Sequence, residues 1–118
     1  MPWEKEYGYA QAVKAGETVW LSGQLGHDDT GVMAEGMEAQ MRQTYANIEK
    51  LLLSYGMTIR DVVEEVVYVM DIQAAFVARK KLGKEVYPNP MEVTSTLIGV
   101  VGLAIPGQLV EIKIMAIK

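Results

Sequence analysis

The sequence predicts an α+β protein, a two-layer sandwich in which two helices cover one face of a mixed sheet. Short β-prone runs flank and separate two long segments whose apolar residues recur every three or four positions. Read in order, these segments give the pattern ββαβαββ. The length of 118 residues suits a single domain, residues 1–118, with one hydrophobic core.

The first two strands are expected to form a hairpin. The sequence YAQAVK predicts a strand at residues 9–14, and TVWLSGQL predicts a second at residues 18–25. The turn Ala15-Gly16-Glu17 between them contains the glycine that short hairpin loops favour. After the second strand, GHDDTG has the composition of a loop.

Two amphipathic helices are predicted, at residues 37–55 and 72–87. Gly56 stands where a left-handed C-terminal cap of the first helix belongs, and Pro88 and Pro90 end the second. The apolar face of the first helix carries Met37, Met41, Tyr45, Ile48, Leu52 and Tyr55. That of the second carries Ala75, Ala78, Leu82 and Val86.

Three further strands are expected, at residues 62–70, 94–101 and 109–117, the first of them preceded by a capped turn at residues 58–61. In strand 62–70 one face would carry Val62, Glu64, Val66, Tyr68 and Met70, and the other Val63, Glu65, Val67 and Val69. In strand 109–117 one face would carry Val110, Ile112, Ile114 and Ala116, and the other Leu109, Glu111, Lys113, Met115 and Ile117. Both faces are largely apolar, and one small domain cannot bury both. Oligomerisation through the sheet is therefore predicted.

The composition excludes several classes of function. Without cysteine there is no disulfide scaffold and no thiol nucleophile, and a reducing cytoplasm fits this composition. The N-terminus lacks the apolar run of a signal peptide, and the longest apolar stretch, residues 97–106, is too short to span a bilayer. A net charge of -4 argues against nucleic acid as a partner. We expect a cytoplasmic protein that binds neither membrane nor nucleic acid.

No cofactor or metal is predicted. His27 is the only histidine, and with Asp28 and Asp29 it offers too few ligands for a typical metal site. The two aspartates are instead expected to hold their own turn through backbone hydrogen bonds. The glycines of SGQLG match no nucleotide-binding spacing, and nothing places His27 beside a serine for a catalytic relay.

Two features of the predicted strands indicate residues that could bind a ligand or act in catalysis. Ser22 and Gly23 end a buried strand, where a glycine lets a ligand or another backbone approach closely. Glu111 lies within an apolar strand, so its carboxylate either faces a cavity or is paired with Lys113 or with a neighbouring chain. The sequence leaves both alternatives open.

Three small hydroxyl residues, Thr94, Ser95 and Thr96, open an otherwise apolar strand. A buried hydroxyl needs a hydrogen-bond partner. We therefore expect these residues either to lie at a solvent-exposed end of the strand or to line a binding site.

The segments YAQAV, VWLSGQLG, QTYANIEKLLLSYGMTIRDVVEEVVYVMDI and GLAIPGQLVEIKIMAI closely resemble the Rid (YjgF) family, the reactive intermediate deaminases that are also labelled endoribonuclease L-PSP. The resemblance runs in order over residues 9–117. It implies a chorismate-mutase-like homotrimer with a small-metabolite cleft at each subunit interface. That expectation agrees with the two-sided apolar sheet.

The resemblance also implies an activity and a set of residues. Family members hydrolyse enamines and imines such as 2-aminoacrylate to ketoacids and ammonia, without a cofactor. An arginine holds the substrate carboxylate and a glutamate positions the attacking water. On this sequence the glutamate is Glu111, and Tyr9, Ser22 and Gly23 line the cleft.

The family's arginine does not match. Its position falls on Ser95, and a shift by one residue gives Thr94 or Thr96. A hydroxyl lacks the charged, planar fork that holds a carboxylate by two hydrogen bonds. The chain's own arginines fall on predicted helices or the capped turn, so a replacement cation would come from a neighbouring subunit, for example Lys14.

The sequence therefore resembles an arginine-less branch of the family, for which three functions compete. The first is a hydrolase that keeps Glu111 but takes another imine or a neutral substrate, with Thr94, Ser95 or Thr96 bonding a carbonyl or hydroxyl. The second is a non-catalytic trimer that binds a small metabolite. The third, an endoribonuclease, is the least favoured, because the chain is acidic and its lone histidine makes no acid–base pair.

Overall fold

The computed structural model describes residues 2–118 and contains the predicted series of strands and helices, preceded by a short helix that the sequence reading missed. In chain order the elements are α1 (Trp3–Tyr7), β1 (Ala12–Ala15), β2 (Thr18–Gln24), α2 (Met37–Leu53), β3 (Val62–Val69), α3 (Ile72–Val86), β4 (Thr94–Gly99) and β5 (Val110–Ile117). Single 3-10 turns, η1 (Ile59–Asp61) and η2 (Pro90–Glu92), precede β3 and β4.

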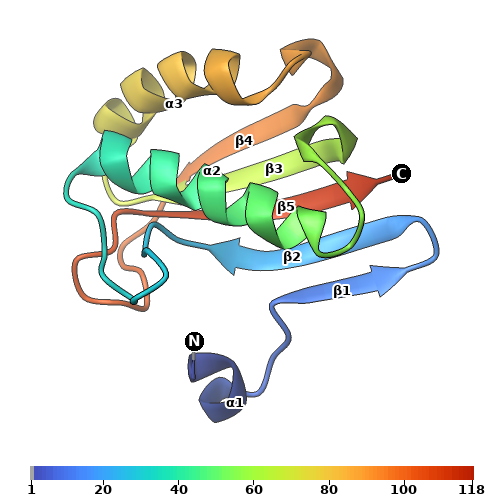
Figure 1. The fold of residues 1–118 in the computed structure, drawn as a ribbon. Helices are drawn as coiled ribbons and strands as arrows, with labels where there is room; N and C mark the ends of the chain where they lie inside the picture. The colour runs from blue at the N-terminus through green and yellow to red at the C-terminus, as the bar shows by residue number, and fades with distance from the viewer. Residues whose placement is uncertain (1) are drawn as a thin grey trace.

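The strands form one five-stranded sheet in the order β1-β2-β5-β3-β4. Three of the pairings are antiparallel, and β3 pairs with β4 in parallel, so the sheet is mixed. Helices α2 and α3 lie on the same side of the sheet, whereas α1 lies apart from them near the β1–β2 edge (Figure 1). The predicted α+β class with two helices over one sheet face is confirmed.

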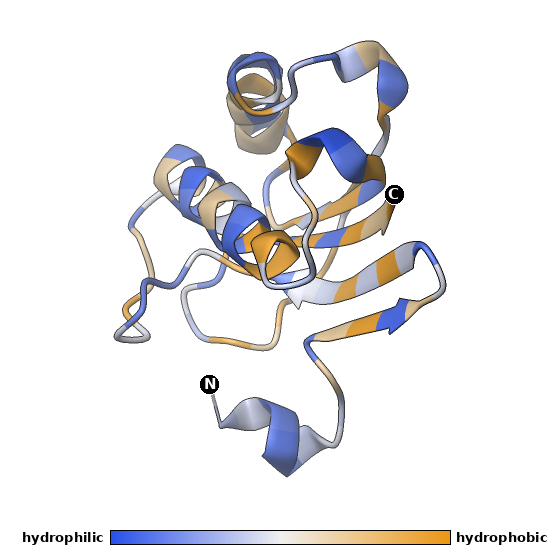
Figure 2. Cartoon of the chain, turned by 45° about the vertical axis from the view of Figure 1, so that its right-hand side comes forward, coloured by the Kyte–Doolittle hydropathy of each residue, from blue (hydrophilic) through white to orange (hydrophobic). Residues whose placement is uncertain are grey.

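The core lies between the sheet and the two long helices. Strand β5 shows why, because Val110, Ile112, Ile114 and Ala116 alternate with exposed or half-buried residues and are at most 1% exposed. Hydrophobic and hydrophilic residues alternate visibly along the strands (Figure 2). The apolar faces of α2 and α3 pack against them, through Met41, Tyr45, Ile48, Leu52, Ala75, Ala78 and Leu82.

One predicted face assignment is wrong. Val62 was expected opposite Val67, yet it is 1% exposed and lies on the core side. The β3–β5 pairing shifts between Val62 and Glu64, and such an irregularity moves the residue before it to the other face. From Glu64 onward the predicted alternation holds.

Local signals end and begin the elements as expected. After α2, Gly56 adopts a φ of 71°, and the amides of Met57 and Gly56 donate to the carbonyls of Leu52 and Leu53. This is the hydrogen-bond pattern of a Schellman C-cap. At η1 the Thr58 side chain accepts from the Arg60 amide while the Thr58 amide donates to Asp61, so the predicted capped turn is confirmed.

The other face of the sheet is left open by residues 2–118 (Figure 1). It carries large apolar side chains, among them Trp20 and Ile117, which are 41% and 43% exposed, and Ile98, which is 38% exposed. The sequence prediction that both faces are apolar therefore describes this sheet. Oligomerisation through the open face stays a prediction.

Within residues 2–118, none of the helices is both long and apolar enough to cross a membrane.

Candidate functional site

A cavity of about 470 Å³ opens between α1, the end of β2, the start of β5 and the loop before β5. Four of the residues named from the sequence, Tyr9, Ser22, Gly23 and Glu111, line it together. The sequence reading did not name the remaining lining residues, which are Trp3, Tyr7, Leu25, Ala104, Ile105 and Gln108.

Glu111 and Gly23 are in direct contact, and the contact explains the glycine. A Cβ on Gly23 would lie 2.4 Å from Cδ of Glu111, much closer than atoms can pack. The β2–β5 pairing is interrupted between Leu21 and Gln24, so the strand bulges at this point. The bulge makes room for the Glu111 side chain, whose carboxylate accepts no hydrogen bond from residues 2–118. It is therefore available to a ligand or to water.

Hydrogen bonds fix Ser22 at the same point. Its hydroxyl donates to the Ala10 carbonyl at 2.6 Å, and its amide donates to the Gln11 carbonyl at 2.8 Å. The Gln24 amide group then donates to the Gln11 side chain at 2.7 Å. These contacts tie the segment before β1 to the end of β2. They hold Tyr9, the next residue back along the chain, at the cavity.

The environment of Tyr9 is negative. Burial raises the pKa of the Tyr9 hydroxyl, and the charges of Glu4 and Glu111 raise it further, against a hydrogen bond with Gln11 that lowers it. Tyr9 therefore stays protonated at neutral pH and can donate a hydrogen bond. Its ring packs edge-on against Tyr7, with the centroids 6.0 Å apart.

Two buried glutamines shape the loop that closes the cavity. Gln40 of α2 donates to the Gly107 carbonyl at 2.9 Å and accepts from the Leu109 amide at 2.8 Å. Gln108 accepts from the Ile105 amide and donates to the Val110 carbonyl. Because both ends of the loop are bonded in this way, the cavity wall is largely preformed.

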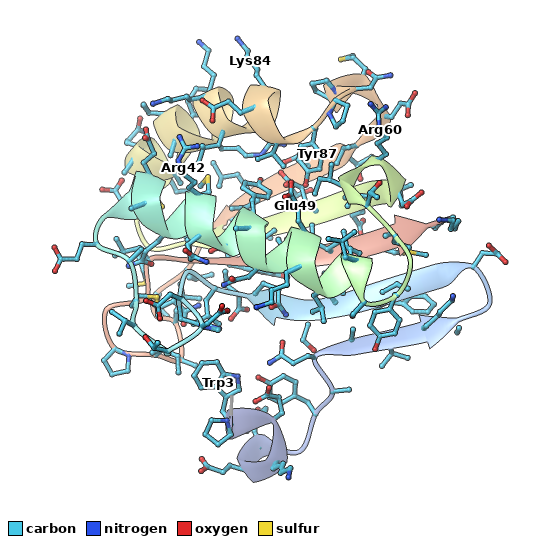
Figure 3. All side chains as sticks on the ribbon, viewed as in Figure 1. Trp3, Arg42, Glu49, Arg60, Lys84 and Tyr87 are labelled. Carbon is cyan, nitrogen blue, oxygen red and sulfur yellow. The ribbon has the colours of Figure 1, made fainter. Side chains whose placement is uncertain are left out.

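Helix α1 supplies Trp3 and Tyr7, two aromatic residues of the cavity lining that the sequence reading missed. Trp3 extends from α1 toward the loop after β2 (Figure 3), and its ring meets His27 edge-on with centroids 5.5 Å apart. The signal was present in Gly8, which ends α1 with a φ of 86° and donates to the Glu4 carbonyl. A helix this short carries too little hydrophobic periodicity to be seen from sequence.

The three hydroxyl residues of β4 do not line the cavity of their own chain. Ser95 pairs in register with Glu65 of β3 and donates to its carboxylate at 2.5 Å on the helix-covered side of the sheet. Thr94 donates to the Val63 carbonyl at 3.0 Å. Thr96 lies exposed on the strand at the sheet edge. Any role for these residues beside Glu111 therefore requires a second subunit.

Glu65 is the centre of a buried polar network that the sequence reading did not identify. One carboxylate oxygen accepts from the hydroxyls of Tyr45 and Tyr87 at 2.6 and 2.7 Å, and the other accepts from Arg79 Nε at 2.6 Å. Tyr87 lies between α3 and the sheet (Figure 3). Burial and the charge of Glu65 raise the pKa of both tyrosines, so both remain donors. Together with Ser95, four donors satisfy this carboxylate.

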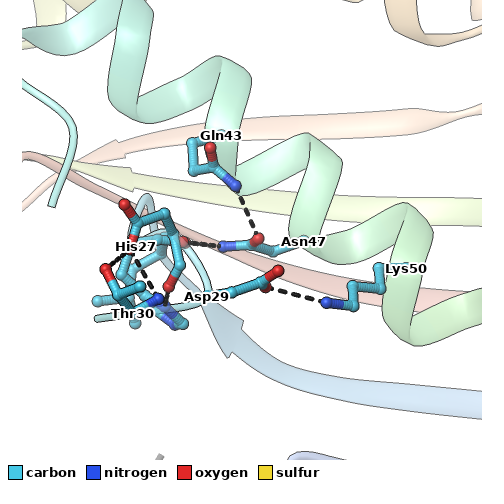
Figure 4. Close-up of polar contacts among 8 residues, drawn as sticks. His27, Asp29, Thr30, Gln43, Asn47 and Lys50 are labelled. Carbon is cyan, nitrogen blue, oxygen red and sulfur yellow. Dashed lines mark hydrogen bonds and ion pairs between the residues drawn. The ribbon is translucent and has the colours of Figure 1, made fainter. Parts of the chain in front are cut away.

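In the loop around His27, the predicted role of the aspartates is confirmed for Asp28, whereas Asp29 pairs with α2. Asp28 accepts hydrogen bonds from the amides of Thr30 and Val32 and from the Thr30 hydroxyl, which holds the turn. Asn47 of α2 donates to the His27 carbonyl and Lys50 pairs with Asp29 (Figure 4). Among residues 2–118, no group of three or more potential ligands is placed to hold a metal ion.

Within one chain, neither Lys14 nor Arg79 reaches the cavity, and a replacement cation from a neighbouring subunit stays a prediction. Lys14 is exposed on β1 and does not line it. Arg79 approaches Ser95 only through their shared partner Glu65, on the opposite side of the sheet from Glu111. Of the cavity-lining residues found within positions 2–118, none is lysine or arginine.

Comparisons with known proteins agree with this fold. The family model described as endoribonuclease L-PSP matches residues 3–118. A RutC family protein of Aquifex aeolicus (strain VF5) is 31% identical over 118 residues, covering 93% of this chain and 88% of the relative. A 2-iminobutanoate/2-iminopropanoate deaminase of Dermatophagoides farinae is 32% identical over 91 residues, covering 75% and 70% of the two chains.

A solved structure has the same architecture. RidA from the Antarctic bacterium Psychrobacter sp. PAMC 21119 superimposes with a TM-score of 0.88 at 32% identity, covering 94% of this chain and 89% of the other.

Proposed function

Because the chain belongs to the endoribonuclease L-PSP family, which is the Rid (YjgF) family, we propose that its cavity binds a small imine or enamine and hydrolyses it to a carbonyl compound and ammonia. The carboxylate of Glu111 carries this proposal. It faces a preformed cavity, lies against a glycine, and has no hydrogen-bond partner among residues 2–118. The deaminase relative supports imine hydrolysis as the reaction type.

In this mechanism Glu111 orients a water molecule and takes one of its protons as the oxygen attacks the imine carbon. The electrons of the C=N bond move to nitrogen and give a carbinolamine. Glu111 returns the proton to nitrogen and then takes the hydroxyl proton as the C=O bond forms and the C–N bond breaks, which releases ammonia. Tyr9 donates a hydrogen bond to the substrate, and Ser22, anchored to Ala10, presents a lone pair to the N–H.

We further propose that three copies assemble through the open sheet face, with a cavity at each interface. The exposed apolar side chains of that face, among them Trp20, Ile98 and Ile117, support an interface. In such a trimer the edge strand β4 of one copy would bring Thr94, Ser95 and Thr96 toward the cavity of the next. Light scattering of the purified chain tests this, and a monomer at micromolar concentration would contradict it.

The substitution of the family's arginine by Ser95 bears on the substrate. Ser95 already donates to Glu65, so it offers no charged fork to a carboxylate. Loss of a two-bond clamp weakens carboxylate binding by several kcal/mol, at about 1.5–3 kcal/mol for each charge-assisted bond. The proposed hydrolase therefore does not depend on a substrate carboxylate.

We place this activity in the cytoplasm, without nucleic acid or membrane partners and without a cofactor. The cysteine-free sequence and the net charge of -4 support this placement.

The test is ammonia release from a panel of imines generated in place, with Glu111→Gln as the variant. Glutamine keeps the shape of the side chain but cannot take a proton, so we expect a loss of about 10²-fold or more. Glu49→Gln on the exposed face of α2 is the matched control and should retain full activity. Equal activity of the Glu111 variant and the parent would contradict the proposal.

The second candidate is a non-catalytic metabolite-binding trimer, which the missing arginine favours. It predicts no ammonia release from any imine, together with a ligand that raises the melting temperature in a thermal-shift screen. Glu111→Gln would then change affinity alone.

A further inference from the structure

The aromatic wall of the cavity comes from one short stretch of chain. Trp3, Tyr7 and Tyr9 lie within residues 3–9 and line the same cavity. None of the α1 side chains is buried, and Tyr7 is 86% exposed. Burial in the core therefore does not account for these rings. Exposed aromatic side chains that border a cavity are typical of ligand contact.

The charge of the lining is one-sided. Among the lining residues that residues 2–118 of one chain supply, Glu111 is the only one that is formally charged, and none is lysine or arginine. Glu4 lies close enough to Tyr9 for its charge to raise the Tyr9 pKa, after burial and together with Glu111. Among the described residues, the charge of the lining itself is that of the Glu111 carboxylate. An aromatic-walled space with this charge repels a carboxylate and attracts a cation, both through the charge and through the electron-rich ring faces.

The size and polarity of the cavity also favour a ligand with an apolar group and no carboxylate. Its volume of about 470 Å³ far exceeds what an imine as small as 2-aminoacrylate would fill. Leu25, Ala104 and Ile105 add further apolar side chains to the lining. Gln108 is 4% exposed, and its amide accepts from the Ile105 amide and donates to the Val110 carbonyl, so at most one N–H is left for a ligand. The space suits an apolar group of about the size of a phenyl ring.

We propose that the cavity selects a protonated imine that carries an apolar, phenyl-sized group and no carboxylate, the class of imine formed when a primary amine is oxidised. This assignment rests on the proposed function, since it names the substrate class of the same site. Trp3 and Tyr7 contact the apolar group, and Glu111 faces the C=NH₂⁺ carbon. The reaction balances as R–CH=NH₂⁺ plus water giving R–CHO and NH₄⁺. Water's oxygen bonds to carbon, the C–N bond breaks, and the protons move to nitrogen by way of Glu111.

Two imines that differ only in the carboxylate test the proposal. An amino-acid oxidase generates 2-imino-3-phenylpropanoate from phenylalanine, and a flavin-dependent amine oxidase generates 2-phenylethanimine from 2-phenylethylamine, each with catalase to remove peroxide. The full chain is added, and its acceleration of ammonia release is measured for each imine. We expect the acceleration to be at least about tenfold larger for the imine without a carboxylate.

Stable analogues give a second measurement that does not need catalysis. Calorimetry should detect binding of 2-phenylethylammonium and much weaker binding of 3-phenylpropanoate. Trp3→Ala and Tyr7→Ala should each lower the affinity for 2-phenylethylammonium by about tenfold, because ring contacts are lost. Phe76→Ala is the matched control, because Phe76 is 59% exposed on α3 and does not line the cavity. It should leave binding unchanged.

The outcomes separate the two proposals. Faster hydrolysis of the carboxylated imine, or tighter binding of 3-phenylpropanoate, overturns the substrate class and leaves imine hydrolysis standing. Binding of the ammonium ligand without hydrolysis of either imine overturns the hydrolase and keeps the ligand class. If neither imine is hydrolysed and neither analogue binds, both proposals fail.

Discussion

Two glutamates in apolar strands of the same sheet have opposite surroundings. Glu65 of β3 faces the helices, is 0% exposed, and is bonded by Tyr45, Arg79, Tyr87 and Ser95. Glu111 of β5 faces the open side, borders a cavity and has no hydrogen-bond partner among residues 2–118. A carboxylate with four donors is part of the architecture, whereas one with none is free to act on a ligand.

The comparison also clarifies the hydroxyl-rich start of β4. The family resemblance places the arginine's position on Ser95, and within this chain Ser95 belongs to the Glu65 network and not to the cavity. Its hydroxyl and the guanidinium of Arg79 bond the same oxygen of Glu65. The position has thus become part of the packing between β4 and α3. The chemistry of the cavity then rests on Glu111 and the aromatic wall.

The largest expected effect is on stability, from Glu65→Leu. The change leaves two tyrosine hydroxyls, a serine hydroxyl and the Arg79 charge without their shared acceptor in a buried site. Breaking a buried ion pair in this way costs about 3–5 kcal/mol of unfolding free energy. Urea denaturation measures it. Glu49→Leu on the exposed face of α2 serves as the control and should change stability by less than about 0.5 kcal/mol. If the two substitutions destabilise the protein equally, the network does not contribute to stability.

The second prediction concerns alkaline pH. The folded pKa values of Tyr45 and Tyr87 are raised by burial and by Glu65, so at high pH the unfolded chain loses protons that the folded chain keeps. Their contribution to stability is complete below the unfolded pKa of about 10 and is lost progressively as pH rises above it. Each tyrosine adds a slope of about -1.4 kcal/mol per pH unit.

Urea titrations between neutral pH and pH 11 measure that slope. Tyr87→Phe should make the slope less steep by the contribution of about one proton. Tyr55→Phe, which lies outside the network, serves as the control and should leave the slope unchanged. A parent protein whose stability does not fall above pH 10 would contradict the assignment.

The third prediction tests how Arg79 reaches Glu65. Arg79 lies one turn before the buried Gly83 on α3, and a Cβ on Gly83 would clash with Nη1 of Arg79. Gly83→Ala therefore displaces a guanidinium that its ion pair with Glu65 holds in place, and we expect a net loss of about 1–2 kcal/mol. In an Arg79→Ala background the same change should stabilise the helix by about 1 kcal/mol. Without that reversal of sign, the steric argument fails.

The sequence allowed the cavity to be predicted only in part, for physical reasons. Tyr9, Ser22, Gly23 and Glu111 were named in advance, because neighbouring strands bring them together and the family resemblance marks them. Trp3 and Tyr7 of the aromatic wall were missed, since α1 is too short to show a hydrophobic period. The bulge that moves Val62 to the core leaves no signal in the alternation of residues.

The Glu65 network shows a different limit. Strand alternation correctly placed Glu65 with Val67 and Val69, on what proved to be the helix-covered face. Its partners, however, come from α2, from α3 and its C-cap, and from β4, at separations of 14 to 30 residues. No local pattern links residues so far apart. The sequence therefore placed Glu65 on one face of the strand without showing that it is buried or which groups satisfy it.

The smallest expected effect on stability is that of Glu111→Gln, and it sharpens the contrast with Glu65. Since Glu111 has no hydrogen-bond partner among residues 2–118, loss of its charge leaves no donor unpaired. We expect the unfolding free energy to change by less than about 0.5 kcal/mol. Urea denaturation of the variant whose ammonia release is measured provides the comparison. A loss of several kcal/mol would mean that Glu111 is structural like Glu65, and the cavity would then lose its reactive group.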